Sequence, residues 1–386
     1  MKAIVTGMIA TYPVGGVAWD YGQYALGLER LGFEVYYLED TGLESYDPVK
    51  REYGPDSEYG IGFLQRSLGA LSPTLGERWH VRTRAGTTHG MPAEDFLDVA
   101  AEANVFLNVS GSALVRDDTL RCRNKVLIDT DPGWNHFRNY PCWDARPGWM
   151  GTHGYRAHDH FFTYAERIGT PECVLPTLGL HWQPTRPPVA LDLWRPQPPA
   201  ERWTTVMTWR NFPESIEYQG RRYGAKEMEF ASIETLPGRT AARLEVAVGG
   251  TEPSVERWRA LGWSVIDSHA VSGGADAYRD YIGGSRGEFS VAKNTYVATR
   301  SGWFSCRTAC YLAAGRPAVV QDTGFSQILP CGEGLVAFRD IDEAAAGIAR
   351  IEADYPRHQA AARSLAEEYF ASGRVLGDLL ERVGIG

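Results

Sequence analysis

Short apolar runs alternate with amphipathic segments along most of this chain, which is the pattern of parallel strands covered by helices. The first unit consists of a strand at residues 2–7, a helix at 19–31 that ends at Gly32, and a strand at 34–39. Further strands are predicted at 104–109, 125–128, 204–209, 244–250, 264–266, 288–292 and 318–320. The fold class that this pattern predicts is α/β, with two Rossmann-like domains facing a cleft.

A proline-rich segment at 184–199 divides the pattern into two halves. Proline stiffens a chain and interrupts regular structure, so we predict an accessible interdomain linker here. Residues 45–90 are rich in Gly, Tyr and Arg and give no firm prediction. From residue 342 onward the composition favours helices, at 342–353, 356–370 and 375–383.

Length and charge narrow the possible functions. The chain has 386 residues, of which 44% are hydrophobic and 23% charged, and a net charge of −9. This composition suits two folded domains and argues against a nucleic-acid partner, which needs a basic surface. The six cysteines are scattered and form no C-x-x-C pair, so reduced thiols are expected. No signal peptide or apolar stretch of membrane-spanning length is found, so we expect a cytoplasmic protein.

The stretch from residue 296 to 338 holds the strongest chemical signal. Ser301-Gly302 is predicted to start a helix that ends at Gly315-Arg316-Pro317, and Thr323-Gly324-Phe325 follows the next strand. A helix start and a strand's carboxyl end would therefore face one crevice, which suits a phosphate. Lys293 and Arg307 would add positive charge. The alternative is an ordinary α/β repeat that binds nothing.

Residues 311–320, reading YLAAGRPAVV, resemble the nucleotide-sugar site of bacterial GT-B glycosyltransferases of the family 1 and family 4 kind. The order of Lys293, then 301–305, then Gly324 and Pro330 also resembles that site. The resemblance implies an acceptor domain at 1–190, a nucleotide-sugar domain at 200–360, and final helices at 361–386 that pack back toward the first domain. One departure is that Gly302 and Cys310 stand where retaining members carry two Glu residues.

The resemblance and the pattern together nominate a set of site residues. The resemblance implies that the Gly15-Gly16 loop lies near the donor diphosphate and that Trp209 and Arg210, after the first strand of the second domain, contact the donor. Trp209 is equally compatible with a core position. The full donor-binding set is Gly15, Gly16, Trp209, Arg210, Lys293, Ser301, Gly302, Trp303, Phe304, Ser305, Arg307, Thr323, Gly324 and Phe325.

Asp131, at the end of the strand at 125–128, is the candidate catalytic base, and Asp20 is the next candidate. Asp131 is otherwise a loop acid that caps a turn. The Asp129-Thr130-Asp131 triplet invites a metal, but GT-B enzymes generally need none, so no metal is expected.

The function that this implies is transfer of a hexose-type sugar from a nucleoside-diphosphate sugar, as co-substrate, to a small acceptor. A nucleotide-sugar epimerase and a non-catalytic nucleotide-sugar-binding protein are the alternatives. No further cofactor is expected, and the chain would act as a monomer or homodimer.

Overall fold

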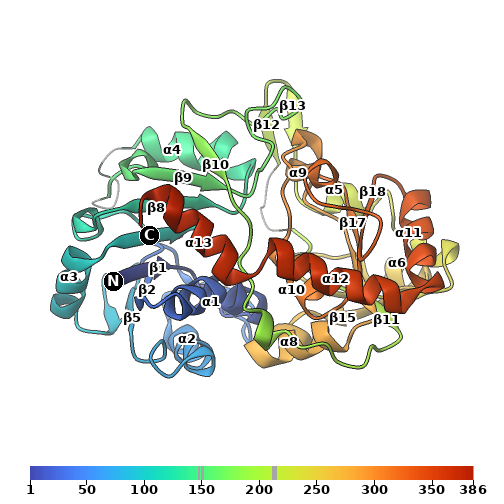
Figure 1. The fold of residues 1–386 in the computed structure, drawn as a ribbon, viewed down its shortest axis with the longest axis horizontal. Coiled ribbons are helices and arrows are strands. Elements are labelled where there is room, and N and C mark those ends of the chain that lie inside the picture. The colour runs from blue at the N-terminus through green and yellow to red at the C-terminus, as the bar shows by residue number, and fades with distance from the viewer. Residues whose placement is uncertain (147, 149–151, 211–214, 386) are drawn as a thin grey trace.

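The first half of the chain folds into one eight-stranded sheet, which the helices of that half cover on both faces (Figure 1). The computed structural model describes residues 1–146, 148, 152–210 and 215–385. All neighbouring strands of this sheet are parallel except the pair β5 and β6, which is antiparallel. In spatial order the strands are β10 (Trp182–Pro184), β9 (His160–Thr163), β8 (Lys125–Asp129), β7 (Val105–Val109), β1 (Lys2–Thr6), β2 (Glu34–Glu39), β5 (Trp79–Arg82) and β6 (Thr88–Gly90).

Buried strands of Val, Ile, Leu and Tyr form the centre of this domain, as expected for a sheet with helices on both faces. Its helices are α1 (Gly15–Arg30), α2 (Glu58–Leu71), α3 (Ala93–Glu102) and α4 (Tyr140–Asp144). Helix α2 and strands β5 and β6 lie in the segment that gave no sequence prediction. Phe63, Leu64 and Leu68 bury one side of α2 against the core.

The second half forms a six-stranded sheet in which every neighbouring pair is parallel. Its order is β15 (Ser264–Asp267), β14 (Arg243–Gly249), β11 (Arg202–Thr208), β16 (Gly287–Ser290), β17 (Ala318–Gln321) and β18 (Leu335–Phe338). Its helices are α5 (Glu227–Phe230), α6 (Val255–Ala260), α7 (His269–Ser272), α8 (Ala275–Gly284), α9 (Asn294–Thr299), α10 (Cys306–Ala313), α11 (Ile341–Ala353) and α12 (Tyr355–Tyr369). Two such domains confirm the predicted α/β class.

The last helix, α13 (Ser372–Val383), returns to the first domain (Figure 1). Leu376, Leu379 and Leu380 pack into the core of that domain beside α1. A Cβ built at Gly27 of α1 would overlap Leu376, so the two helices touch closely. The chain therefore begins and ends in the same domain.

The proline-rich linker is only partly accessible, so the prediction of an exposed segment is wrong for its first half. Residues 187–190 are buried, and Val189 N–H donates to the carbonyl of Phe370 at 2.7 Å. The exposed part, 195–200, is held by Arg316, whose guanidinium donates to the carbonyl oxygens of Gln197 and Gly283. The linker is thus packed structure and not a free tether.

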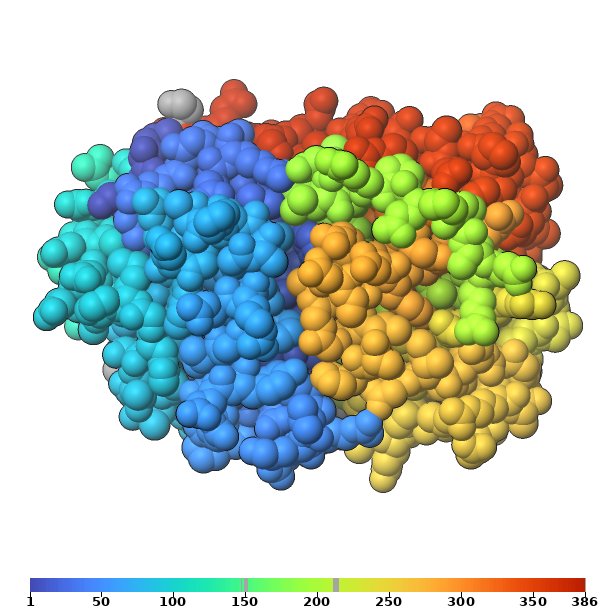
Figure 2. All heavy atoms as spheres, turned by 90° about the horizontal axis from the view of Figure 1, so that it is seen from below, coloured from blue at the N-terminus to red at the C-terminus, as the bar shows by residue number. Residues whose placement is uncertain are grey.

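Two small hairpins bridge the domains in opposite directions. β3 (Ser45–Asp47) and β4 (Glu52–Gly54) belong to the first domain, and Arg51 between them pairs with Asp267 of the second. β12 (Ile216–Tyr218) and β13 (Arg221–Tyr223) belong to the second domain, and Tyr218 stacks on Phe137 of the first with ring centroids 4.4 Å apart. Figure 2 shows the two domains meeting along a seam, with the linker across its upper end.

No helix among the described residues has the length and apolarity needed to cross a membrane.

Candidate functional site

The carboxyl ends of the two sheets face each other, and charged side chains meet between them. Asp131, just after β8, accepts a hydrogen bond from Lys293 Nζ at 2.5 Å and another from the hydroxyl of Tyr296 at 2.5 Å. The indole of Trp303 stacks on Tyr296 at 4.1 Å and donates to the carbonyl of Thr130 at 2.9 Å. Asp131 therefore lies at the domain interface, with both of its oxygens engaged.

Helix α10 starts later than the sequence suggested. Ser301-Gly302 is not its start: α9 ends at Thr299, Arg300 follows it in a left-handed conformation, and a loop leads to Ser305 as the residue before α10. The Ser305 side chain makes no capping hydrogen bond. Among the described residues, the backbone N–H groups from 304 to 308 have no acceptor. A helix start with free donors attracts an anion.

Three basic side chains surround this helix start. The guanidinium of Arg307 is held by hydrogen bonds within the protein. It donates to Glu288 at 2.8 Å, the Val206 carbonyl at 2.7 Å and the Ser290 hydroxyl at 2.5 Å. Lys293 is paired with Asp131. Lys226 is half-buried, and its side-chain amine has no hydrogen-bonding or ion-pair partner among the described residues. Burial, with the charges of Arg307 and Lys293, holds the pKa of Lys226 well below its usual value.

Asp20 of α1 reaches the same helix start from the first domain. Its carboxyl accepts a hydrogen bond from the thiol of Cys306, the first residue of α10. Burial raises the pKa of Asp20 to about 6, against the smaller opposing effect of that hydrogen bond. Burial also raises the pKa of Cys306, so the thiol keeps its proton. Asp20 is thus a half-buried acid with no cationic partner among the described residues.

A buried acid fixes the loop between β1 and α1. Glu39 accepts hydrogen bonds from the N–H of Ala10 at 2.9 Å, the N–H of Thr11 at 2.5 Å and the hydroxyl of Tyr37 at 3.1 Å. The loop continues to Tyr12, whose hydroxyl hydrogen-bonds to Thr208 at the end of β11. Glu39 therefore holds a loop that touches the second domain.

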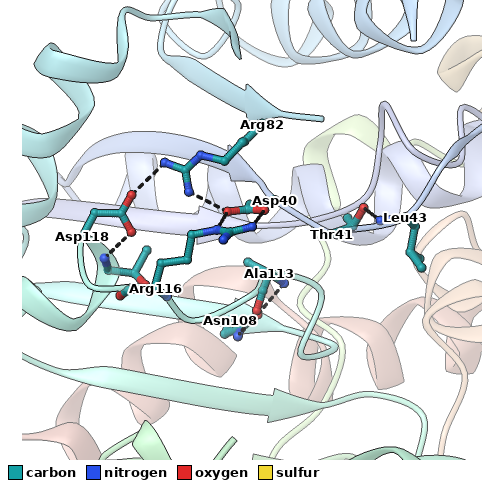
Figure 3. Close-up of polar contacts among 9 residues, drawn as sticks. Asp40, Thr41, Leu43, Arg82, Asn108, Ala113, Arg116 and Asp118 are labelled. Carbon is teal, nitrogen blue, oxygen red and sulfur yellow. Dashed lines mark hydrogen bonds and ion pairs between the residues drawn. The ribbon is translucent and has the colours of Figure 1, made fainter. Parts of the chain in front are cut away.

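The next side chain, Asp40, joins a paired charge network at the same sheet edge (Figure 3). Arg82 donates to Asp40 at 2.7 Å and to Asp118 at 2.8 Å, and Arg116 donates to Asp40 at 2.5 Å. The positive charges of the two arginines are matched by the negative charges of the two aspartates. This network fixes three loops and presents no surplus charge to a ligand.

The loop at 301–303 and the turn at 323–324 form one packed unit rather than an open surface. Gly302 N–H donates to the Thr323 carbonyl at 2.9 Å, and the Thr323 hydroxyl donates to the Trp303 carbonyl at 2.6 Å. Arg167 of the first domain packs over both glycines: a Cβ at Gly302 would lie 2.7 Å from its Cγ, and one at Gly324 would lie 2.8 Å from its Nη1. Ser301 and Gly302 are buried beneath these contacts and do not face an open crevice.

Several other nominated residues belong to the framework. Trp209 packs edge-on against Trp258 at 4.7 Å and Phe230 at 5.7 Å in the core of the second domain. Phe304 contacts Phe325 at 5.2 Å, and both are buried. These side chains shape the site without facing a ligand.

Arg210 is nearly half-exposed and lies 3.6 Å from Glu252. Residues 211–214, which follow it, lie outside the described residues.

Gly15 and Gly16 are the first residues of α1, not a turn before it. A Cβ at Gly15 would overlap the backbone of Gly274, and one at Gly16 would lie 3.3 Å from the ring of Tyr278. The absence of side chains lets α1 approach α8, where the Trp19 indole donates to the Ala275 carbonyl at 2.8 Å. These glycines form a close domain contact.

Asp129, the first acid of the triplet, is fully buried and accepts hydrogen bonds from four side chains. The donors are Asn135 at 2.7 Å, Thr163 at 2.9 Å, the His136 ring at 3.0 Å and the Tyr140 hydroxyl at 3.2 Å. Burial would raise its pKa, but His136 and the hydrogen bonds outweigh it and the pKa is lowered. Among the described residues no group of three or more His, Cys, Asp and Glu side chains is arranged to hold a metal.

The site residues predicted from the sequence leave out three residues of this site: Lys226, Tyr296 and Cys306. Lys226 ends the basic segment 218–226, which the sequence alone allows either to close over a phosphate or to form a solvated loop, and Arg221 and Arg222 of that segment are exposed. Pairing of backbone 224–225 with 294–295 places it beside Lys293, and only the fold provides that pairing.

Two facing Rossmann-like domains, with the chain's last helix returned to the first, define the GT-B architecture. No protein-family model matches the chain, and no curated protein matches its sequence. Solved structures share its fold. AviGT4, a glycosyltransferase involved in avilamycin A biosynthesis, matches with a TM-score of 0.55 at 14% identity, over 99% of this chain and 97% of that one.

HepE from Anabaena, solved in complex with UDP, matches with a TM-score of 0.56 at 11% identity over 100% of both chains. Sucrose-phosphate synthase from Thermosynechococcus elongatus matches with a TM-score of 0.50 at 13% identity over 99% of both chains. At these identities the likeness concerns the fold, and it confirms the GT-B fold expected from residues 311–320.

Proposed function

We propose that this protein is a glycosyltransferase that moves a sugar from a nucleoside-diphosphate sugar to a small acceptor. The observation that carries the proposal is the start of α10, where free backbone N–H groups lie beside Lys226 and Lys293 and opposite Asp20. An anion site next to an acid of raised pKa suits a reaction in which a diphosphate leaves and a hydroxyl loses a proton. The solved structures of the same fold that are named above include AviGT4, described as a glycosyltransferase, and HepE, solved with UDP.

The donor diphosphate would lie against residues 304–308, with Lys226 and Lys293 on its negative oxygens. As the bond between the sugar's anomeric carbon and the phosphate oxygen breaks, its electron pair leaves with the diphosphate. Preorganised N–H donors and ammonium groups stabilise this growing charge. Ser305 contributes its backbone N–H. Arg307 hydrogen-bonds to groups of the protein, so it would act on the diphosphate through its positive charge rather than by direct contact.

The acceptor hydroxyl would attack the anomeric carbon while Asp20 takes its proton. Asp20 fits a base better than Asp131, because its raised pKa keeps its ionisation near working pH and no described cation neutralises it. Asp131 is held by Lys293 and Tyr296 and would orient them. We therefore assign the base role to Asp20 and a positioning role to Asp131.

The test combines binding and turnover. A thermal-shift screen with UDP, GDP, ADP and TDP should raise the melting temperature for at least one of them, because a ligand of the native state stabilises it. The corresponding nucleotide sugars, incubated with hydroxyl-bearing acceptors, should then release nucleoside diphosphate only when an acceptor is present.

Interconversion of the sugar without release would instead indicate an epimerase. Binding without any turnover would indicate a binding protein. Failure of every diphosphate to bind would exclude the whole proposal.

A further inference from the structure

Among the described residues, two of the three cationic side chains around the start of α10 are paired with a carboxylate, and the third is not. Arg307 is neutralised by Glu288 at 2.8 Å, and Lys293 by Asp131 at 2.5 Å. Lys226 is the third cationic residue, and no carboxylate among the described residues lies within ion-pair distance of it. A half-buried ammonium without a counter-ion is costly, and a lysine meets this cost by losing its proton.

The position of Lys226 is fixed by backbone pairing. The N–H of Gly224 donates to the Asn294 side chain at 3.1 Å, the N–H of Asn294 donates to the Ala225 carbonyl at 3.3 Å, and the N–H of Thr295 donates to the Gly224 carbonyl at 3.1 Å. These bonds hold the backbone that carries Lys226 beside the start of α9 and next to Lys293.

The groups that face Lys226 come from three neighbouring elements. Arg307 and Cys306 belong to α10, Lys293 precedes α9, and Glu288 belongs to β16. The two cations disfavour a charge on Lys226, and their effect exceeds the opposing effect of Glu288. Cys306 keeps its proton beside Asp20. Burial and the two cations thus disfavour an ammonium on Lys226, and Asp20, the further acid at the start of α10, hydrogen-bonds to the Cys306 thiol and forms no ion pair with Lys226 among the described residues.

We propose that Lys226 is uncharged in the empty site and takes up a proton when a diphosphate binds at the start of α10. The inference rests on the proposed function and adds that donor binding is proton-linked. The amine gains the proton from solvent, and the diphosphate oxygens supply the counter-charge that the protein lacks. When the diphosphate leaves, the proton leaves with it, so the empty site returns to its uncharged state.

Calorimetry tests this directly. Binding of the diphosphate found in the nucleotide screen is measured at pH 8 in buffers of different ionisation enthalpy, and the dependence of the observed enthalpy on the buffer gives the protons taken up. The parent protein should take up as much as one proton per site. Its affinity should fall as pH rises, by up to about ten-fold per unit, because the bound state holds more protons than the free state.

Three variants separate Lys226 from its neighbours. Lys226→Arg keeps a permanent charge, so it should bind within a few-fold of the parent with no proton uptake. Lys226→Met should bind roughly ten-fold or more weakly and also lack uptake. Asp20→Asn should keep the uptake, because the proton goes to the lysine. Lys50→Met, at an exposed lysine, should match the parent.

The proposal is overturned if the parent binds a diphosphate without proton uptake, or if Lys226→Arg takes up the same number of protons as the parent. Either result leaves the glycosyltransferase proposal standing. If no diphosphate binds, the proposed function fails and the role of Lys226 fails with it. Melting curves of each variant confirm that it is folded before binding is measured.

Discussion

At the scale of single residues, two aspartates on the same domain interface differ in their partners. Asp131 has a lysine and a tyrosine hydroxyl on its oxygens, whereas Asp20 has a thiol. A general base needs a carboxylate oxygen that can accept a proton, so these partners favour Asp20 over Asp131 as the base. The sequence placed Asp131 at a strand's carboxyl edge correctly but could not indicate that Lys293, far along the chain, would neutralise it.

We predict that Asp20→Asn lowers kcat about a hundred-fold or more, which is the usual contribution of a general base. In the parent, kcat/KM for the acceptor, measured with saturating donor, should rise with pH up to about 6, the pKa of Asp20, and then level off, because only the carboxylate accepts a proton. The variant should lose this rise. A pH profile of kcat/KM measures both.

The matched comparison is Asp131→Asn. It should weaken donor binding, because Lys293 loses its counter-charge and one of the two acceptor oxygens that hold Lys293 and Tyr296 becomes an amide donor, but it should keep the rise below pH 6. A profile that stays intact in Asp20→Asn and disappears in Asp131→Asn would reverse the assignment.

At the scale of elements, the loop between α9 and α10 is held by contacts that its amino-acid composition does not indicate. Small residues at 301, 302 and 305 are compatible with the phosphate site predicted from the sequence. In the structure, the missing side chain at 302 leaves room for Arg167. Gly302 has φ of 77°, in the left-handed region that favours glycine. Nothing local distinguishes a glycine that admits a ligand from one that admits a side chain of another domain.

We predict that Gly302→Ala lowers the free energy of unfolding by about 2–4 kcal/mol, from backbone strain and from overlap with Arg167. Chemical denaturation measures this loss.

Gly220→Ala is the control, because Gly220 has a similar φ of 73° and no atom within 4 Å of a built Cβ. Gly220→Ala should lower the free energy of unfolding only by the cost of the backbone strain, about 1–2 kcal/mol. Equal losses in the two variants would mean that contact with Arg167 contributes nothing.

At the scale of the whole molecule, the chain's last helix joins the two domains. α12 packs on the second domain and α13 on the first, and the linker at 187–190 is buried beside their junction. Stability of the first domain therefore depends on residues at the far end of the sequence.

We predict that Leu376→Ala lowers the free energy of unfolding by about 2–5 kcal/mol, the range for truncating a fully buried leucine. Leu97→Ala, at a leucine with 39% exposure on α3, should cost under about 1 kcal/mol. Scanning calorimetry compares the two. A small loss at Leu376 would mean that α13 is not part of the first domain's core.

The sequence by itself determined the α/β class, the central strands of both sheets and the helices α1, α11, α12 and α13, because periodicity and Gly-Pro punctuation act over short distances. It also identified the region around α10 and both candidate acids. Which side chains meet there was decided by tertiary structure. Lys226 reaches Lys293 through a backbone pairing, Asp131 reaches Lys293 across the domain interface, and Arg167 packs over Gly302 from the other domain. These contacts join residues distant in the chain, and their charges interact strongly only because folding removes them from water.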